Sequence, residues 1–217
     1  MNKKIIIAID GNAASGKGTL AKKIAESFDY AYLDTGKLYR ASALLIRENN
    51  IKYRDINEVS NFIKNYNFSN FDFNNIKLKS DNIGKLASLI SGYKELREIL
   101  LVYQREFATK LNNKKSGVIL DGRDIGTIVL PEANIKFFIT ASIGIRAERR
   151  WKELLSLGQS TIKRHVEKDI RDRDNRDTKR KYSPLIPSKD AILIDTTNLD
   201  ANEVFLLAKK HILEYLD

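Results

Sequence analysis

One short segment near the beginning of the chain restricts the possible folds more than any other. An apolar strand pattern, Ile5 to Ile9, is followed by a glycine-rich stretch and then by a helical pattern that begins at Lys17. In such a segment the glycines let backbone N–H groups approach a polyphosphate, and the helix N-terminus adds positive potential. The segment therefore predicts a phosphate-binding loop (P-loop) formed by Gly11, Asn12, Ala13, Ala14, Ser15, Gly16, Lys17, Gly18 and Thr19.

The rest of the chain alternates between short apolar runs and amphipathic helical patterns. Further strands are expected near residues 30–33, 117–121, 135–139 and 191–195, with helices between them. This alternation predicts an α/β fold with three layers, in which helices cover both faces of a mainly parallel sheet. Ligands of such sheets bind beyond the carboxyl ends of the strands.

Two segments interrupt the alternation, and we treat the whole chain, residues 1–217, as one domain that contains both. The first is an insertion at about residues 52–85, called the annex below. Apolar residues alternate with polar ones at Phe71 and Phe73 and again at Ile76 and Leu78, which predicts short antiparallel strands. After it, a helix is expected from Leu86 to Leu111, with a possible break at Ser91-Gly92.

The second segment, at about residues 158–185, carries the charge run Arg171 to Arg180 and is called the lid below. Arg173, Asp177 and Arg180 are spaced so that they would share one face of a helix. Both arginines could then reach a phosphate, while Asp177 orients one of them or binds a ribose. A solvated helix face with internal ion pairs is the alternative.

Composition excludes several classes of function. The chain has no cysteine, which rules out disulfides and thiolate chemistry, and no apolar run approaches the length of a membrane span. The net charge of +10 indicates affinity for polyanions, which include nucleotides, nucleic acids and anionic membranes, and a solvated lysine-rich surface is the alternative. A soluble cytoplasmic protein is expected.

Acidic residues that follow the strands are candidates for a metal site. Asp121 ends an apolar strand and could hold Mg²⁺ through water, with the hydroxyl of Thr19 as a second candidate. That hydroxyl stands one residue later than in the usual motif, because Gly18 follows Lys17. Asp10 occupies a similar place after the first strand, and we interpret it as structural.

If the P-loop belongs to a kinase whose acceptor is a nucleoside monophosphate, the chain needs a second set of cations to bind the phosphate of the acceptor. Arg40 and Arg123 each follow a predicted strand, so both are expected at the same edge of the sheet, where their guanidinium groups suit a phosphate. Transfer of a phosphoryl group needs little more than two anionic nucleotides held in line with their charge neutralised.

Two motifs make a family resemblance specific. Leu33-Asp-Thr-Gly-Lys-Leu-Tyr-Arg40 and Asp121-Gly-Arg-Asp-Ile-Gly-Thr127 resemble signatures of the bacterial cytidylate kinases, and they follow the P-loop in the order of that family. The resemblance implies ATP as co-substrate with Mg²⁺ as cofactor, and CMP or dCMP as acceptor. It implies catalytic roles for Lys17, Arg123, Arg173 and Arg180, and an acceptor site formed by Thr35, Tyr39, Arg40, Ser88, Arg97, Arg123, Asp124 and Asp177.

The chain departs from the family pattern at Lys37, where the family has a small residue, and in the annex, which lacks an Ile-Arg-Thr stretch. The expected function is phosphoryl transfer from ATP to CMP or dCMP by a monomer that binds no nucleic acid. A P-loop kinase for another monophosphate or small alcohol is the first alternative, and a basic nucleotide-dependent RNA-binding protein is the second.

Overall fold

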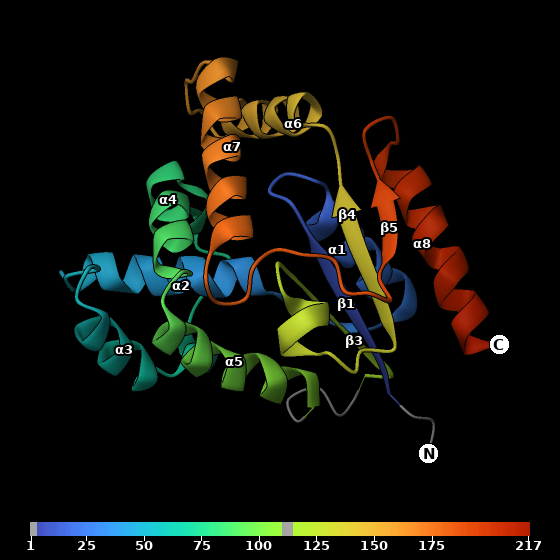
Figure 1. Ribbon diagram of the computed structural model, residues 1–217, viewed down its shortest axis with the longest axis horizontal. Helices are drawn as coiled ribbons and strands as arrows, with labels where there is room; N and C mark the ends of the chain where they lie inside the picture. Colours follow the sequence, from blue (N-terminus) through green and yellow to red (C-terminus); the bar gives the residue numbers. More distant parts are fainter. Residues whose placement is uncertain (1–3, 110–114) are drawn as a thin grey trace.

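A parallel sheet whose middle strand leads into the P-loop organises the molecule (Figure 1). The computed structural model describes residues 4–109 and 115–217, and all structural statements concern these residues. Five strands in this part pair in the order β2-β3-β1-β4-β5, all parallel. They are β1 (Ile5–Gly11), β2 (Ala31–Asp34), β3 (Gly117–Gly122), β4 (Ile135–Thr140) and β5 (Ile192–Asp195).

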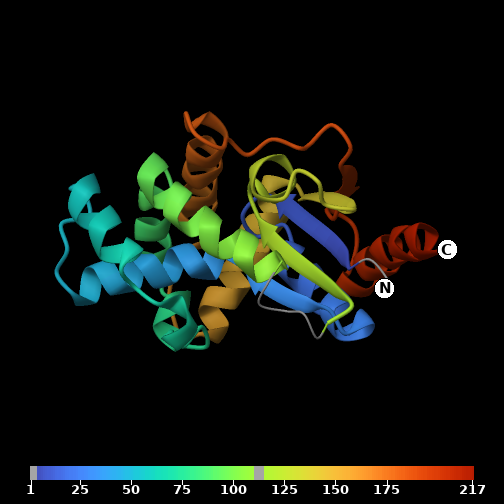
Figure 2. The ribbon, with the colours of Figure 1, turned by 90° about the horizontal axis from the view of Figure 1, so that it is seen from below.

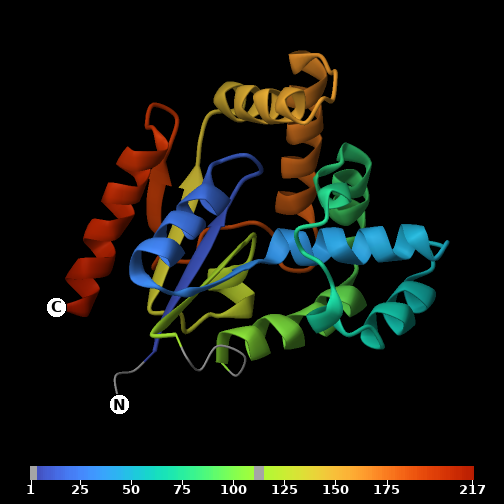
Figure 3. The ribbon, with the colours of Figure 1, turned by 180° about the vertical axis from the view of Figure 1, so that it is seen from behind.

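Alternate residues of β1 supply the two cores on either side of the sheet. Ile5, Ile7 and Ile9 pack on one face with α1 (Lys17–Phe28) and α8 (Ala201–Leu216), the layer that stands in front in Figure 3. Ala8 faces the other side, beneath α5 (Lys94–Thr109) and the short helix η3 (Ile125–Val129). The predicted three-layer α/β fold with a parallel sheet is therefore confirmed.

The helix α2 (Thr35–Glu48) leaves the sheet and carries the annex at its far end (Figures 1 and 2). The predicted annex strands are wrong. The segment instead folds into α3 (Ile56–Lys64), the 3₁₀ turns η1 (Phe68–Asn70) and η2 (Ile76–Lys79), and α4 (Asp81–Ile90).

Short polar side chains explain this outcome. Asn67 accepts a hydrogen bond from the N–H two residues later at 3.0 Å, and Asp72 and Asn75 do the same at 2.9 and 3.0 Å. Such local bonds stabilise turns and compete with strand pairing. The alternating apolar residues nevertheless reach a core, since Phe68 and Leu78 are buried together against α2 and α5.

The predicted interruption at Ser91-Gly92 is confirmed, because α4 ends at Ile90 and α5 begins at Lys94. The side chain of Ser91 donates to the carbonyl of Ser88 at 2.9 Å, which closes the end of α4. The predicted helix end at Leu111 lies outside the described residues. Within the described ranges, no helix is long and apolar enough to cross a membrane.

The lid follows α6 (Ile143–Ser156) and consists mainly of α7 (Lys163–Lys179), which stands beside α4 of the annex (Figure 1). A buried ion pair joins α6 to α7, with Nη1 of Arg146 2.5 Å from Oδ2 of Asp174. Lys85 of α4 lies 3.0 Å from Asp169 of α7. The lid therefore contacts both its supporting helix and the annex.

Gly11 offers a direct test of how the strand is joined to the P-loop. Its φ is +153°, and a Cβ there would stand 2.0 Å from the carbonyl oxygen of Ile139 on β4. We expect Gly11→Ala to lower the free energy of unfolding by about 1–3 kcal/mol, as overpacking of a tight contact does. Urea unfolding followed by circular dichroism measures this.

Gly144→Ala is the matched control, because a Cβ at Gly144, in the first turn of α6, meets no atom within 4 Å. Alanine is the better helix former, so this variant should gain up to about 1 kcal/mol. Equal stability of Gly11→Ala and the wild-type protein would contradict the close approach of β1 to β4.

Candidate active site

The glycine-rich loop has a conformation that depends on its residue types. Gly16, which precedes α1, has a φ of +94°, and Ala14 also lies in the left-handed region, with a φ of 57°. The first turn of α1 holds no acidic side chain, so its positive end is left for an anion. The ammonium group of Lys17 donates to the carbonyl oxygen of Asn12 at 3.2 Å, which bends the side chain back over the loop.

A cavity of about 820 Å³ opens in front of this loop. Its size falls within the roughly 300–1,000 Å³ of ordinary small-molecule sites. The walls come from the P-loop, α2, the annex, the end of β3, α6 and the lid. Cationic side chains that the sequence predicted for the donor and acceptor phosphates line it together: Lys17, Arg40, Arg123 and Arg173.

Arg40 reaches the cavity from α2 and is held by the annex. Its Nη1 donates to the carbonyl oxygens of Leu78 at 2.6 Å and Ser80 at 3.3 Å. Its guanidinium also lies against Gly84, where a Cβ would stand 2.8 Å from Nη2. Burial and the nearby Arg150 lower the pKa of Arg40. The annex thus fixes one edge of the guanidinium through neutral carbonyls and leaves its charge uncompensated there.

The cations near the lid repel one another. Burial and the charge of Arg123 lower the pKa of Arg173 to about 9. Burial and Arg123 also lower the pKa of Lys17. A polyanion in the cavity would relieve this repulsion, because it offers each cation an opposite charge.

Asp177 is the carboxylate that holds the lid to the sheet. Its Oδ2 accepts from Nε of Arg123 at 2.9 Å and lies 3.8 Å from Nε of Arg173. Burial acts to raise its pKa, but Arg123, Arg173 and Arg180 outweigh burial, and the pKa of Asp177 is lowered. The ion pair therefore connects α7 to the residue that follows β3.

The expectation that Arg180 shares a helical face with Arg173 and Asp177 needs correction. α7 ends at Lys179, and Arg180 has an extended conformation with a φ of −62° and a ψ of 144°. The chain then turns through Ser183 in the left-handed region, just before Pro184, which cannot continue a helix. Arg180 does not line the large cavity but points to Asp124, with Nη2 3.7 Å from Oδ1.

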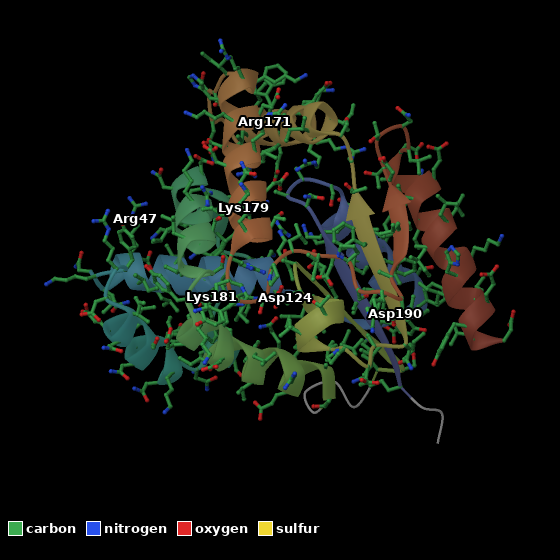
Figure 4. The ribbon with its side chains drawn as sticks, in the orientation of Figure 1. Arg47, Asp124, Arg171, Lys179, Lys181 and Asp190 are labelled. Carbon is green, nitrogen blue, oxygen red and sulfur yellow. The ribbon has the colours of Figure 1, made fainter. Side chains whose placement is uncertain are left out.

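Asp124 lies near the centre of the molecule, below the end of α7 in Figure 4. Its Oδ2 accepts from Nη2 of Arg97 on α5 at 2.5 Å, and Nη1 of Arg97 donates to the carbonyl of Ser91 at 3.0 Å. The guanidinium of Arg97 lies 5.4 Å from the ring centroid of Tyr39. Three of the side chains predicted for the acceptor, Tyr39, Arg97 and Asp124, therefore meet here, together with Arg180, which was predicted to be catalytic.

Two other predicted acceptor residues have different surroundings. The hydroxyl of Thr35 donates to the carbonyl of Asp121 at 2.7 Å and is buried away from the cavity, so it ties α2 to β3. Ser88 lines the large cavity, and its oxygen lies 3.2 Å from Nε of Arg176 on the lid. Arg176 and Ser88 also line a smaller adjoining cavity of about 410 Å³, which Asp177 and Arg180 border.

The residues around Asp121 fit a magnesium ion that also binds phosphate. Asp34 and Asp121 are paired neighbours on β2 and β3. Burial and the charge of Asp34 raise the pKa of Asp121. Gly18 of the P-loop is close, since a Cβ there would stand 3.5 Å from Oδ2 of Asp121. Magnesium sites commonly combine one or two carboxylates with substrate phosphates. Thr19, the other predicted ligand, is exposed and lies outside the cavity wall.

Sequence reasoning missed two arginines of α6. Arg150 lines the cavity, where Glu153 holds it at 2.9 Å, and its charge lowers the pKa of Arg40 and Arg173. Arg146 donates to the carbonyl of Ala13 in the P-loop at 3.3 Å, in addition to its ion pair with the lid. The only signal for them was their spacing of four residues on a helix that follows a strand.

These features define a class of protein. A parallel sheet of order β2-β3-β1-β4-β5, with a P-loop after its middle strand and a cation-lined cavity beneath a helical lid, is the architecture of a P-loop kinase.

Comparison with known proteins gives the family. The cytidylate kinase family model matches residues 7–215. A protein named cytidylate kinase from Paramagnetospirillum magneticum is 43% identical over 203 residues, which cover 94% of this chain and 95% of that one. One with the same name from Clostridium botulinum is 43% identical and covers 92% of this chain and 94% of its own. The chain belongs to the cytidylate kinase family and is a phosphotransferase.

A solved structure supports the fold alone. The crystal structure of an uncharacterized protein from Eubacterium ventriosum superposes with a TM-score of 0.52 at 16% identity. The match covers 98% of this chain and 99% of that chain.

The ion pairs of Asp177 should make the stability of the protein depend on pH. The pKa of Asp177 is lowered in the folded state, so its contribution is complete above about pH 4, near the unfolded pKa. The contribution is lost as the pH falls through the folded pKa. We expect Asp177→Asn to cost up to about 3–5 kcal/mol at pH 7, because it leaves the half-buried arginines around it without their buried carboxylate. The cost should shrink below about pH 4.

Urea unfolding at pH 7 and pH 3 measures both effects. Glu167→Gln is the control on the same helix, since Glu167 pairs with Arg171 in solvent at 2.7 Å. An exposed pair of this kind contributes about 0.3–0.5 kcal/mol. A cost for Asp177→Asn as small as that of the control at pH 7 would argue against a lid held by Asp177.

Proposed function

We propose that the protein transfers the γ-phosphoryl group of ATP to CMP or dCMP and forms ADP with CDP or dCDP. One observation carries this proposal: Lys17, Arg40, Arg123 and Arg173, from four separate stretches of chain, line one cavity in front of the P-loop. Two nucleotides placed end to end would set their phosphates among these cations. Membership of the cytidylate kinase family supports the choice of acceptor.

The reaction needs charge neutralisation and alignment more than covalent chemistry. The P-loop amides and Lys17 would hold the phosphates of ATP, while Arg40 and Arg123 would hold the acceptor phosphate in line with them. The acceptor oxygen is already anionic, so no strong base is required. The structure offers Arg173 and Arg150 to stabilise the negative charge that spreads over the transferred group.

A role for Arg180 in stabilising the charge of the transferred group remains a prediction. Its guanidinium lies beside Asp124, and it would have to turn toward the cavity to meet the transferred group. A lid that closes over both nucleotides would also exclude water and limit hydrolysis of ATP.

Magnesium would bind between Asp121, Asp34 and the phosphates of ATP. The ion supplies charge neutralisation and aligns the phosphate oxygens when it is bound. Asp121 would orient it, directly or through water, from the end of β3. The hydroxyl of Tyr32 donates to Oδ1 of Asp121 at 3.2 Å and leaves Oδ2 on the side of Gly18.

Recognition of the base would rest on Asp124 and its partners. Cytosine carries an exocyclic amino group that can donate a hydrogen bond to a carboxylate, and it carries acceptors at O2 and N3 to which Arg97 and Ser88 can donate. Uracil would present a carbonyl to Asp124 and be rejected, because two acceptors would then face each other. We further propose that the enzyme acts as a monomer in the cytoplasm.

A panel of monophosphates tests the proposal. Turnover of CMP, dCMP, UMP, AMP and GMP is measured with ATP and Mg²⁺ in a coupled assay of ADP release. We expect kcat/KM for CMP to exceed that for UMP by at least about 100-fold, because a site that hydrogen-bonds one base leaves buried groups unpaired with another. Chelation of Mg²⁺ should abolish turnover.

Faster turnover of AMP or UMP than of CMP would instead favour a P-loop kinase with another acceptor. Tight, salt-dependent RNA binding without turnover of any monophosphate would favour the RNA-binding alternative, whose support is the net charge of +10.

A further inference from the structure

Asp10 is a buried carboxylate that the proposed reaction does not use. It is the residue of β1 directly before Gly11, and it is 4% exposed. Its two oxygens each accept one backbone hydrogen bond at 2.8 Å, Oδ1 from the N–H of Ile125 and Oδ2 from the N–H of Gly126. Both N–H groups belong to the first turn of η3, which follows Asp124.

The start of η3 is therefore capped from a neighbouring strand. Asp124 is the N-cap residue, and an aspartate at this position normally accepts from the N–H groups of the first turn. The side chain of Asp124 makes no such bond. Its carboxylate instead faces Arg97 at 2.5 Å and Arg180 at 3.7 Å. Asp10 accepts from the N–H groups of Ile125 and Gly126, and the second of these is one that an N-cap side chain commonly satisfies.

The winding of η3 fits this arrangement. It is a single turn of π-helix, a conformation found often at functional sites. β1 and β3 run side by side here, with Asp10 paired to Gly122, so Asp10 lies close to the segment that carries Arg123 and Asp124. One residue later, the same strand becomes the P-loop. Asp10 thus links the donor loop and the acceptor segment through a rigid part of the sheet.

We propose that Asp10 is a positioning residue for base selection, which caps η3 in place of Asp124 and so keeps the Asp124 carboxylate turned toward Arg97, the pair that would select the acceptor base. This inference rests on the proposed function. Without the Asp10 carboxylate, the first-turn amides of η3 lack an acceptor, and the side chain of Asp124 can rotate to cap its own helix. Discrimination between cytosine and uracil would then weaken while ATP binding stays.

Asp10→Asn tests this with little change in volume. The amide keeps one acceptor oxygen and places an NH₂ donor against the other N–H. We expect the ratio of kcat/KM for CMP over UMP to fall roughly 10- to 100-fold, as small misplacements in active sites do. The fall should come mainly from a higher KM for CMP. The KM for ATP should stay within about 2-fold, since within the described ranges the hydrogen bonds of the Asp10 side chain go to η3 and not to the P-loop.

Asp200→Asn is the matched control. Asp200 also accepts from two backbone N–H groups at a helix N-terminus, at 2.6 and 2.9 Å, but it caps α8 and does not line the cavity. The Asp200→Asn variant should keep the wild-type ratio of kcat/KM for CMP over UMP. Asp124→Asn completes a double-mutant cycle with Asp10→Asn. Since Asp10 acts through Asp124, the double variant should select no worse than Asp124→Asn alone.

The outcomes separate the two proposals. If the wild-type enzyme shows no preference for CMP over UMP, both the proposed function and this inference fail. If wild type prefers CMP, then an unchanged ratio in Asp10→Asn, or effects that multiply in the double variant, overturns the inference alone. Asp10→Ser, smaller and with one oxygen, is the second variant. Loss of ATP binding in both variants would also overturn it, because Asp10 would then support the fold generally.

Discussion

Repulsion between half-buried like charges is the interaction on which the structure of this site depends. Lys17, Arg40, Arg123 and Arg173 line the same cavity, and burial lowers the pKa of the first, second and fourth. A protein can tolerate such a cluster where the molecule that binds there carries the opposite charge. Binding of a polyphosphate would offset this repulsion and so stabilise the folded protein.

The supports of these cations lie on different parts of the molecule. Backbone carbonyls of the annex hold Arg40, Asp177 of the lid holds Arg123, and Glu153 of α6 holds Arg150. Movement of the annex or the lid would therefore carry charges toward or away from the P-loop. Ion pairs between the two parts, such as Lys85 with Asp169, stabilise the arrangement in which the cations are together. The positions of the annex and the lid therefore determine how closely the cations gather in front of the P-loop.

Much of the fold and part of the site could be predicted from the sequence. The P-loop was readable because glycines, a lysine and a following helix must occur in a fixed local order. Arg40 and Arg123 were predictable because each follows a strand, and parallel strands end at one edge. The structure of the annex could not be predicted. Its apolar residues recur at every second position, which suited a strand, but Asn67, Asp72 and Asn75 form turns instead. Arg150 and the capping by Asp10 depend on contacts across the fold, which no local pattern encodes.

The proposed transfer requires one continuous cavity that holds both nucleotides with their phosphates end to end. The most direct measurement is calorimetric binding of adenosine and cytidine joined through five phosphates. We expect one molecule to bind per chain and to displace both ATP and CMP. Its affinity should be at least roughly 100-fold above that of ATP alone, since one ligand fills both sites. Simultaneous binding of this compound with either nucleotide, or affinity no greater than that of ATP, would contradict it.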